Sequence, residues 1–185
     1  MLVADAQRES RTVYLGGSVG QLVSAVVWLA SAAVGTLVSP VAGFWALALG
    51  GAAIFPLTQA TLHLAGRPAA LSAGNPLRGL AMQVAFTIPL ALPVAAAATL
   101  HRAGWFYPAC LVIVGAHYLP FVFLYGMWTF AALAAALVGC GYAIGLLAPD
   151  EVTLGGWVGG VTLLVFAGAL FAAYRKGENR SATPG

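Results

Sequence analysis

The sequence predicts an all-α, polytopic membrane protein with six transmembrane helices and both termini in the cytoplasm. Three observations favour this fold class: the composition, the length of the apolar runs and the placement of Lys and Arg. The chain has 185 residues, of which 61% are hydrophobic and 7% are charged, whereas a soluble domain carries about 25% charged residues. A soluble globule of this composition lacks the polar groups to cover its surface, so lipid is the expected solvent.

Six apolar runs are long enough to cross a bilayer, because a helix rises about 1.5 Å per residue and the hydrocarbon core is about 30 Å thick. Residues 30–32 resemble a signal-peptidase site, but the apolar run is longer than the roughly 7–15 residues of a signal peptide, so we expect a retained helix. The membrane domain covers 13–174, between a cytoplasmic tail at 1–12 and a basic cytoplasmic tail at 175–185. Its spans are predicted at residues 13–37, 41–64, 77–100, 105–125, 127–148 and 152–174.

Local signals mark the ends of several helices. Ser39 and Pro40 predict a tight turn after the first span, since proline restricts its neighbour and ends helical pairing. Asn75 is expected to cap the third span, with the following proline at its first helical position. Trp105 and Tyr107 open the fourth span, where aromatic side chains typically lie at the membrane interface.

Prolines lie inside three of the predicted spans: Pro56 in the second, Pro89 and Pro93 in the third, and Pro120 in the fourth. Proline lacks the backbone N–H and frees the carbonyl one turn earlier, which for Pro120 is that of Ala116. We therefore expect these three helices to be broken. Broken helices at membrane depth can line the polar cavity of a transporter.

The placement of Lys and Arg predicts the orientation. The side without the tails holds only Arg102. Cytoplasmic loops carry an excess of basic residues, so we expect an inner (plasma) membrane protein with both termini inside. The side with the tails holds the other seven, which are Arg8, Arg11, Arg67, Arg78, Arg175, Lys176 and Arg180.

Polar side chains within the spans are concentrated in the predicted cytoplasmic half. The outer half holds little beyond Ser, Thr, two cysteines and Tyr142. Polar groups at membrane depth face the bundle interior or a wet cavity, so this layer predicts a pocket open to the cytoplasm. Its members are Gln21, Gln59, His63, Gln83, His117 and Tyr118.

Each member also has a structural interpretation. A glutamine at depth commonly bonds to a neighbouring helix, and this is the favoured interpretation for each glutamine taken alone. His63 lies near the interface and is expected to reach solvent. His117 lies in an uncharged run, where burying an ionisable ring costs free energy, so ligand binding and interhelical contact are equally favoured. For Tyr118, packing is favoured over ligand binding.

Small residues indicate close helix contacts in the sixth span. Packing within the chain is the favoured interpretation, and a homo-oligomer face is the alternative. Cys110 and Cys140 lie in apolar runs and are expected to be buried thiols rather than a disulfide or metal site. The glycines form two overlapping pairs with small-xxx-small spacing, Gly155, Gly156, Gly159 and Gly160.

The chain resembles a set of small bacterial polytopic membrane proteins grouped only as a domain of unknown function. The likeness runs from about Gly50 to Tyr125, and the two ends of this chain are richer in Ala and Gly than is usual for that set. The resemblance implies a six-span bundle, draws attention to Asn75 as well as His117, and implies no activity. It is carried by Ile54-Phe55-Pro56-Leu57, Asn75-Pro76-Leu77 and Gly115-Ala116-His117-Tyr118-Leu119-Pro120.

We predict that the protein binds or transports a small neutral or apolar solute, such as a lipid-like molecule. No acidic or basic side chain lies at membrane depth, whereas ion-coupled transporters usually carry one. An accessory or structural subunit of a larger membrane complex is the alternative. The candidate substrate-binding residues are His117, Tyr118, Gln59, Gln83, Gln21, His63 and Asn75.

A membrane enzyme or cofactor carrier is less favoured. Haem ligation by His63 and His117 requires both rings to reach one iron, yet the two are predicted at different depths. No catalytic residue, metal or cofactor is expected. The lipid bilayer is the expected partner, and nucleic acid is excluded because no basic stripe with interleaved aromatics is present.

Overall fold

The computed structural model describes residues 1–182, with side chains described for residues 1–177. No strand occurs among these residues. Residues 183–185 of the predicted basic tail lie outside the described part of the chain. The elements are α1 (Val3–Val13), η1 (Leu15–Gly17), α2 (Ser18–Leu37), α3 (Pro40–Leu64), α4 (Arg78–His101), η2 (Ala103–Trp105), α5 (Phe106–His117), α6 (Leu119–Tyr125), α7 (Thr129–Leu147) and α8 (Leu154–Ala182).

Six helical segments are long and apolar enough to span a membrane, which confirms the predicted all-α class and the number of spans. Their ends fall within a few residues of the predicted ones, because an apolar run bounded by polar residues fixes where a membrane helix begins and ends. The segments are Leu15–Leu37, Pro40–Leu64, Arg78–His101, Ala103–Tyr125, Thr129–Leu147 and Leu154–Gly177.

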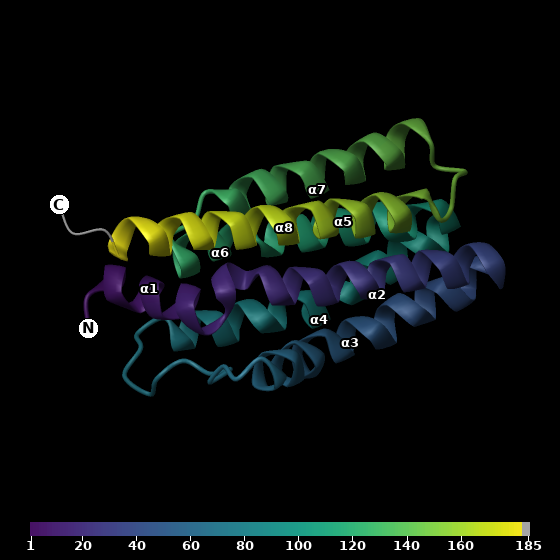
Figure 1. Cartoon of the computed structure of the whole chain (residues 1–185). Helices are drawn as coiled ribbons and strands as arrows, with labels where there is room; N and C mark the ends of the chain where they lie inside the picture. The colour runs from purple at the N-terminus through teal and green to yellow at the C-terminus, as the bar shows by residue number, and fades with distance from the viewer. Residues whose placement is uncertain (183–185) are drawn as a thin grey trace.

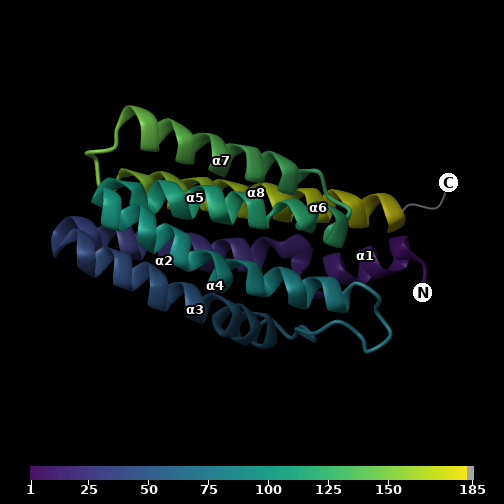
Figure 2. The ribbon, with the colours of Figure 1, turned by 180° about the vertical axis from the view of Figure 1, so that it is seen from behind.

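The helices form a bundle with α7 on one side and α3 on the other (Figures 1 and 2). Helix α2 packs against α3 and α8, α7 packs against α5 and α8, and α4 packs against α5. Helices α3 and α4 lie at the periphery of the bundle. Only 11% of the most apolar stretch of each helix is buried, and the two helices make little contact with each other. The start of α1, the end of α8 and the α3–α4 loop share one end of the bundle, which we call the terminal end (Figure 1). The α2–α3 and α7–α8 connections lie at the opposite, distal end.

The N-terminal segment differs from the predicted tail. It forms the separate helix α1, and the first span begins at Leu15 rather than at residue 13. Gly16 and Gly17 have φ angles of +65° and +82°, which glycine adopts without the steric cost of a side chain. A Cβ at Gly16 would also lie 2.9 Å from the Cβ of Tyr174. The two glycines therefore let the chain turn between α1 and α2 while it packs against α8.

Tyr107, predicted to open the fourth span, is fully buried in the distal half of the bundle. Its hydroxyl donates a 2.7 Å hydrogen bond to Ser31 Oγ, which in turn donates to the carbonyl of Gly43 at 2.8 Å. A Cβ added to Gly43 would lie 2.6 Å from the Cα of Gly35, so the backbones of α2 and α3 touch at this point. Tyr107 can be buried because Ser31 satisfies its hydroxyl.

The glycines of the sixth span pack within the chain, against α2 and α5. A Cβ added at Gly159 would lie 2.5 Å from Cε3 of Trp28, and one at Gly155 would lie 2.7 Å from the Cβ of Tyr107. This is the intramolecular packing that the sequence favoured, and it leaves these glycines covered rather than facing lipid or a second copy. All four are buried: Gly155, Gly156, Gly159 and Gly160.

Of the predicted helix breaks, only the one in the fourth span is present. Helices α3 and α4 continue through Pro56, Pro89 and Pro93, so the expected breaks in the second and third spans are wrong. A membrane helix tolerates proline because leaving the helix would expose more unpaired backbone to lipid. In the fourth span, α5 and α6 meet at Tyr118, and Pro120 lies in the first turn of α6, where its missing N–H is not needed.

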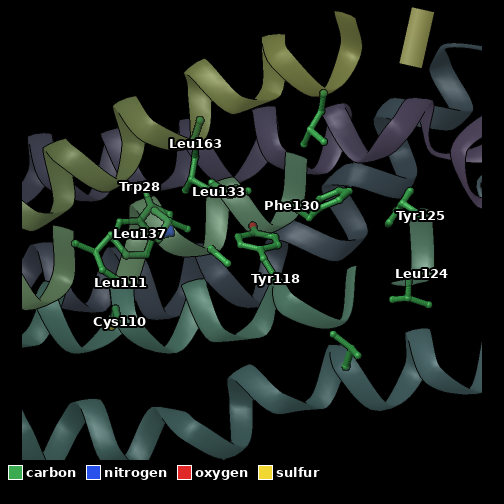
Figure 3. Close-up of a cluster of buried hydrophobic side chains, with 14 of the residues drawn as sticks. Trp28, Cys110, Leu111, Tyr118, Leu124, Tyr125, Phe130, Leu133, Leu137 and Leu163 are labelled. Atoms are coloured by element: carbon green, nitrogen blue, oxygen red, sulfur yellow. The ribbon is translucent and has the colours of Figure 1, made fainter. Parts of the chain in front are cut away.

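The hydrophobic core runs between α2, α5, α7 and α8 (Figure 3). In the close-up, Trp28 lies with the leucines of α5 and α7, and Tyr118 lies beside Phe130. The core thus extends from the buried residues near the distal end to the break between α5 and α6. Its fully buried leucines are Leu111, Leu133, Leu137, Leu163 and Leu170.

Candidate functional site

Tyr118 lies at the α5–α6 break and is 5% exposed. Its ring stacks with that of Phe130 of α7 at a centroid distance of 6.2 Å (Figure 3). Its hydroxyl interacts with the side chains of Gln21 and Ser24 on α2. Both α2 residues are also buried, and their three-residue spacing places them on one helix face. Three polar side chains from two spans therefore meet inside the bundle.

Two buried polar atoms in this region have no hydrogen-bond partner among the described residues: Oε1 of Gln21 and Oγ1 of Thr58 on α3. Thr58 packs against α2 at Gly20, the residue before Gln21, since a Cβ added at Gly20 would lie 3.9 Å from Thr58 Oγ1. An unpaired buried polar group costs about 1–3 kcal/mol, and native structures contain few of them. Gln21 and Thr58 therefore carry hydrogen-bonding capacity that the described residues do not satisfy.

His117 faces α4 rather than α2. Its Nδ1 lies 2.8 Å from Oγ1 of Thr87, and the Thr87 hydroxyl donates to the carbonyl of Val84 at 2.7 Å. Because that hydroxyl hydrogen is already used, the contact is satisfied when Nδ1 carries the proton and donates to Thr87. The imidazole also packs against Phe121 at a centroid distance of 5.1 Å. His117 thus joins α4 to α5, on a different side of the fourth span from the Tyr118 hydroxyl.

The remaining members of the predicted layer are dispersed. Gln59 is half-buried and interacts with the hydroxyl of Tyr14, whose pKa is raised by burial. His63 and Gln83 are exposed. All lie in the terminal half of their helices, but among the seven candidates the structure brings together only Gln21 with Tyr118, and Tyr118 with its chain neighbour His117, the two rings being 5.5 Å apart.

Asn75 is buried against α1 rather than in the bundle. Its Nδ2 donates to the carbonyl of Ala6 at 3.2 Å and to Oε2 of Glu9 at 2.9 Å, while its Oδ1 accepts from the backbone N–H of Leu77 at 2.8 Å. The prediction that Asn75 caps the third span is wrong, because α4 begins at Arg78 with Leu77 as its N-cap. The Asn75 side chain instead holds the turn that precedes α4.

The carboxylate of Glu9 joins α1 to the α3–α4 loop. It accepts hydrogen bonds from the backbone N–H of Ser72 at 2.5 Å, from Ser72 Oγ at 3.1 Å and from Asn75. These bonds, led by that from the Ser72 amide, lower the pKa of Glu9. Helix α1 is therefore held against the α3–α4 loop at the terminal end of the bundle. Two more of its side chains donate to carbonyls of α6, from Gln7 to Phe123 and from Arg11 to Tyr125.

Sequence reasoning missed four residues of these contacts: Ser24, Thr58, Thr87 and Glu9. Ser24 carried a signal, since it follows Gln21 by one helical turn. The two threonines carried none, because threonine is common in membrane helices and often bonds to its own backbone. Glu9 lies more than sixty residues from its loop partners, so no local pattern marks it.

The chemistry available at this site is hydrogen bonding by neutral groups. Cys110 and Cys140 are free thiols. Within residues 1–182, no group of three or more His, Cys, Asp or Glu side chains is placed to hold a metal ion. Amide, phenol and hydroxyl groups can orient a ligand but supply no strong acid or base.

Comparison with known proteins places the chain in a family. Neither the curated proteins nor the solved structures gave a significant match. One family model matches residues 3–173, a range that includes α1, α2 to α7 and most of α8. This match confirms the resemblance to a family of unknown function that the sequence motifs indicated. The chain therefore belongs to the family of unknown function DUF7010.

Proposed function

We propose that this integral membrane protein binds or transports a small neutral or apolar solute at an intramembrane site formed by Gln21, Tyr118 and Thr58. We further propose that it lies in the inner membrane with both termini inside, since Lys and Arg are in excess on the side of the tails. The site would then lie in the cytoplasmic half of the membrane. The proposed site does not include His63 and Gln83, which are exposed.

One observation carries this proposal: the buried Oε1 of Gln21, next to the Tyr118 hydroxyl, has no hydrogen-bond partner among the described residues. A ligand that pairs with this atom recovers the free energy that an unpaired buried acceptor costs. The surrounding groups are neutral, which disfavours a charged solute because its desolvation would be uncompensated. His117 borders the site through its contact with Tyr118.

Native mass spectrometry of protein purified gently from membranes tests this function. The expected result is a retained small molecule that is lost in Gln21→Leu, which removes the amide at similar size. Gln83→Leu is the matched control, because Gln83 is exposed at the same end of the bundle. Retention that is absent from the wild type, or equal in the two variants, would contradict the proposal.

A second candidate is an accessory subunit of a larger membrane complex. It is favoured by the peripheral position of α3 and α4, where Trp45, Leu49 and Leu90 are 64%, 69% and 78% exposed. A partner helix lying on these faces would contact them in place of lipid. Co-purification of a stoichiometric partner, lost when Trp45 and Leu49 are replaced by alanine, would support this candidate over the first.

A further inference from the structure

The two unpaired atoms, on Gln21 and Thr58, differ in whether they can donate a hydrogen bond. Oε1 of Gln21 accepts hydrogen bonds and cannot donate them, whereas the hydroxyl of Thr58 can do both. Threonines in membrane helices often donate to their own backbone, and Thr36, Thr61 and Thr99 do so here at 2.7–2.8 Å. The Thr58 hydroxyl has no such partner. A group that donates to Gln21 and accepts from Thr58 satisfies both.

Thr58 lies where α3 packs against α2, at the residue before Gln21. Gly20, the residue before Gln21, has no side chain, and its missing Cβ would lie 3.8 Å from Cγ2 of Thr58. Thr58 therefore lies against the α2 backbone at Gly20, one residue from Gln21 in the chain. A single hydroxyl group, which is both donor and acceptor, is the smallest group that matches this pair.

The surface between α3 and α4, next to Gln21 and Thr58, is apolar. Helices α3 and α4 make little contact with each other, so the side of α3 toward α4 is not covered by α4. Phe55, one turn before Thr58, is 67% exposed, and Met82 and Phe86 of α4 are each 57% exposed in the same half of the bundle. An apolar chain that leaves Gln21 and Thr58 would pass over these exposed apolar side chains.

We propose that the site takes a neutral amphiphile whose polar end is a hydroxyl group and whose apolar chains lie along the surface between α3 and α4. This inference rests on the proposed function and specifies its ligand class. The hydroxyl donates to Oε1 of Gln21 and accepts from Oγ1 of Thr58. A charged headgroup is excluded, because the amide, phenol and hydroxyl groups of this site offer no counter-charge.

A pair of probes that differ in one hydrogen-bond donor tests the inference. The full chain in lipid nanodiscs is titrated with 1,2-dioctanoylglycerol and with its 3-O-methyl ether, and binding is followed by native mass spectrometry. The alcohol is expected to bind about tenfold or more tightly than the ether, since the ether leaves Gln21 unpaired. Gln21→Leu and Gln21→Met should abolish the difference, and Thr58→Val should reduce it. Thr61→Val is the matched control, because Thr61 is exposed and bonded to its own helix.

The outcomes separate this inference from the proposed function. Equal binding of alcohol and ether, or a difference that survives both Gln21 variants, would overturn the hydroxyl assignment while leaving a solute-binding site. The same holds if a molecule retained from membranes is lost in Gln21→Leu but is not displaced by the alcohol. Absence of any retained molecule would overturn the proposed function itself. Circular dichroism of each variant confirms that the helices remain formed.

Discussion

Replacing Gly159 by alanine should destabilise the bundle, although alanine favours helices more than glycine does. The added Cβ would lie 2.5 Å from Cε3 of Trp28 and 2.8 Å from Cδ2 of Leu111, both side chains being buried. Ordinary contacts of a Cβ begin at about 3.4 Å, so α8 or the indole must move by about 1 Å. Overpacking of this kind costs about 1–3 kcal/mol.

The matched control is Gly168→Ala on the same helix, where a Cβ meets nothing within 4 Å. There the gain in helix propensity, up to about 1 kcal/mol, acts alone. At Gly159 the same gain offsets part of the packing cost and leaves a net loss of up to about 2 kcal/mol. Thermal unfolding in one detergent should therefore show a lower Tm for Gly159→Ala and an unchanged or higher Tm for Gly168→Ala.

Trp28→Phe provides the cross-check, because the smaller ring vacates the position that the new methyl needs. The double variant should lose less stability than the sum of the two single variants. Equal Tm shifts for the two glycine variants, or strict additivity with Trp28→Phe, would refute the assignment of Gly159 to this contact.

Three further changes test other contacts. The lowered pKa of Glu9 means that its bonds stabilise α1 docking above the ordinary pKa of 4.5 and fail as pH falls through the lowered value. The protection factor of the Ser72 amide against hydrogen exchange, which corrects for the intrinsic pH dependence of the rate, should therefore fall only in acid for the wild type and already at neutral pH for Glu9→Gln. Tyr107→Phe should lower stability by about 1 kcal/mol in detergent unfolding, whereas Tyr142→Phe, at a 60% exposed residue, should not. Arg102→Ala removes an exposed salt bridge and should change stability by less than about 1 kcal/mol in the same assay.

The spans were predictable because membrane helices are defined by length and apolarity, which are properties of the sequence alone. The rotation of each helix about its own axis, which decides which residues face the bundle, was not predictable. Helices α3 and α4 are apolar on every side, so nothing in their sequence indicated that Gln83 would be exposed while Thr58 would be covered. Gln21 was easier to place, because Ser18, Ser24 and Ser31 mark the same buried face of α2.

The α1 helix shows the other limit. Its residues are polar and mixed in charge, a composition equally typical of a solvated tail. What orders it are contacts with Ser72, Asn75 and the carbonyls at the end of α6, all distant in the chain. Those contacts depend on the arrangement of the bundle, which apolar run lengths do not determine.

The burial of Trp28 has a consequence for optical work on this protein. Of the five tryptophans, Trp28 is 3% exposed, whereas Trp45, Trp128 and Trp157 are 64%, 81% and 40% exposed and Trp105 is half-buried. A variant that keeps only Trp28 would emit from a position that acyl chains do not reach. Brominated lipids quench indole fluorescence on contact, so its emission would dim only when α2 and α8 separate.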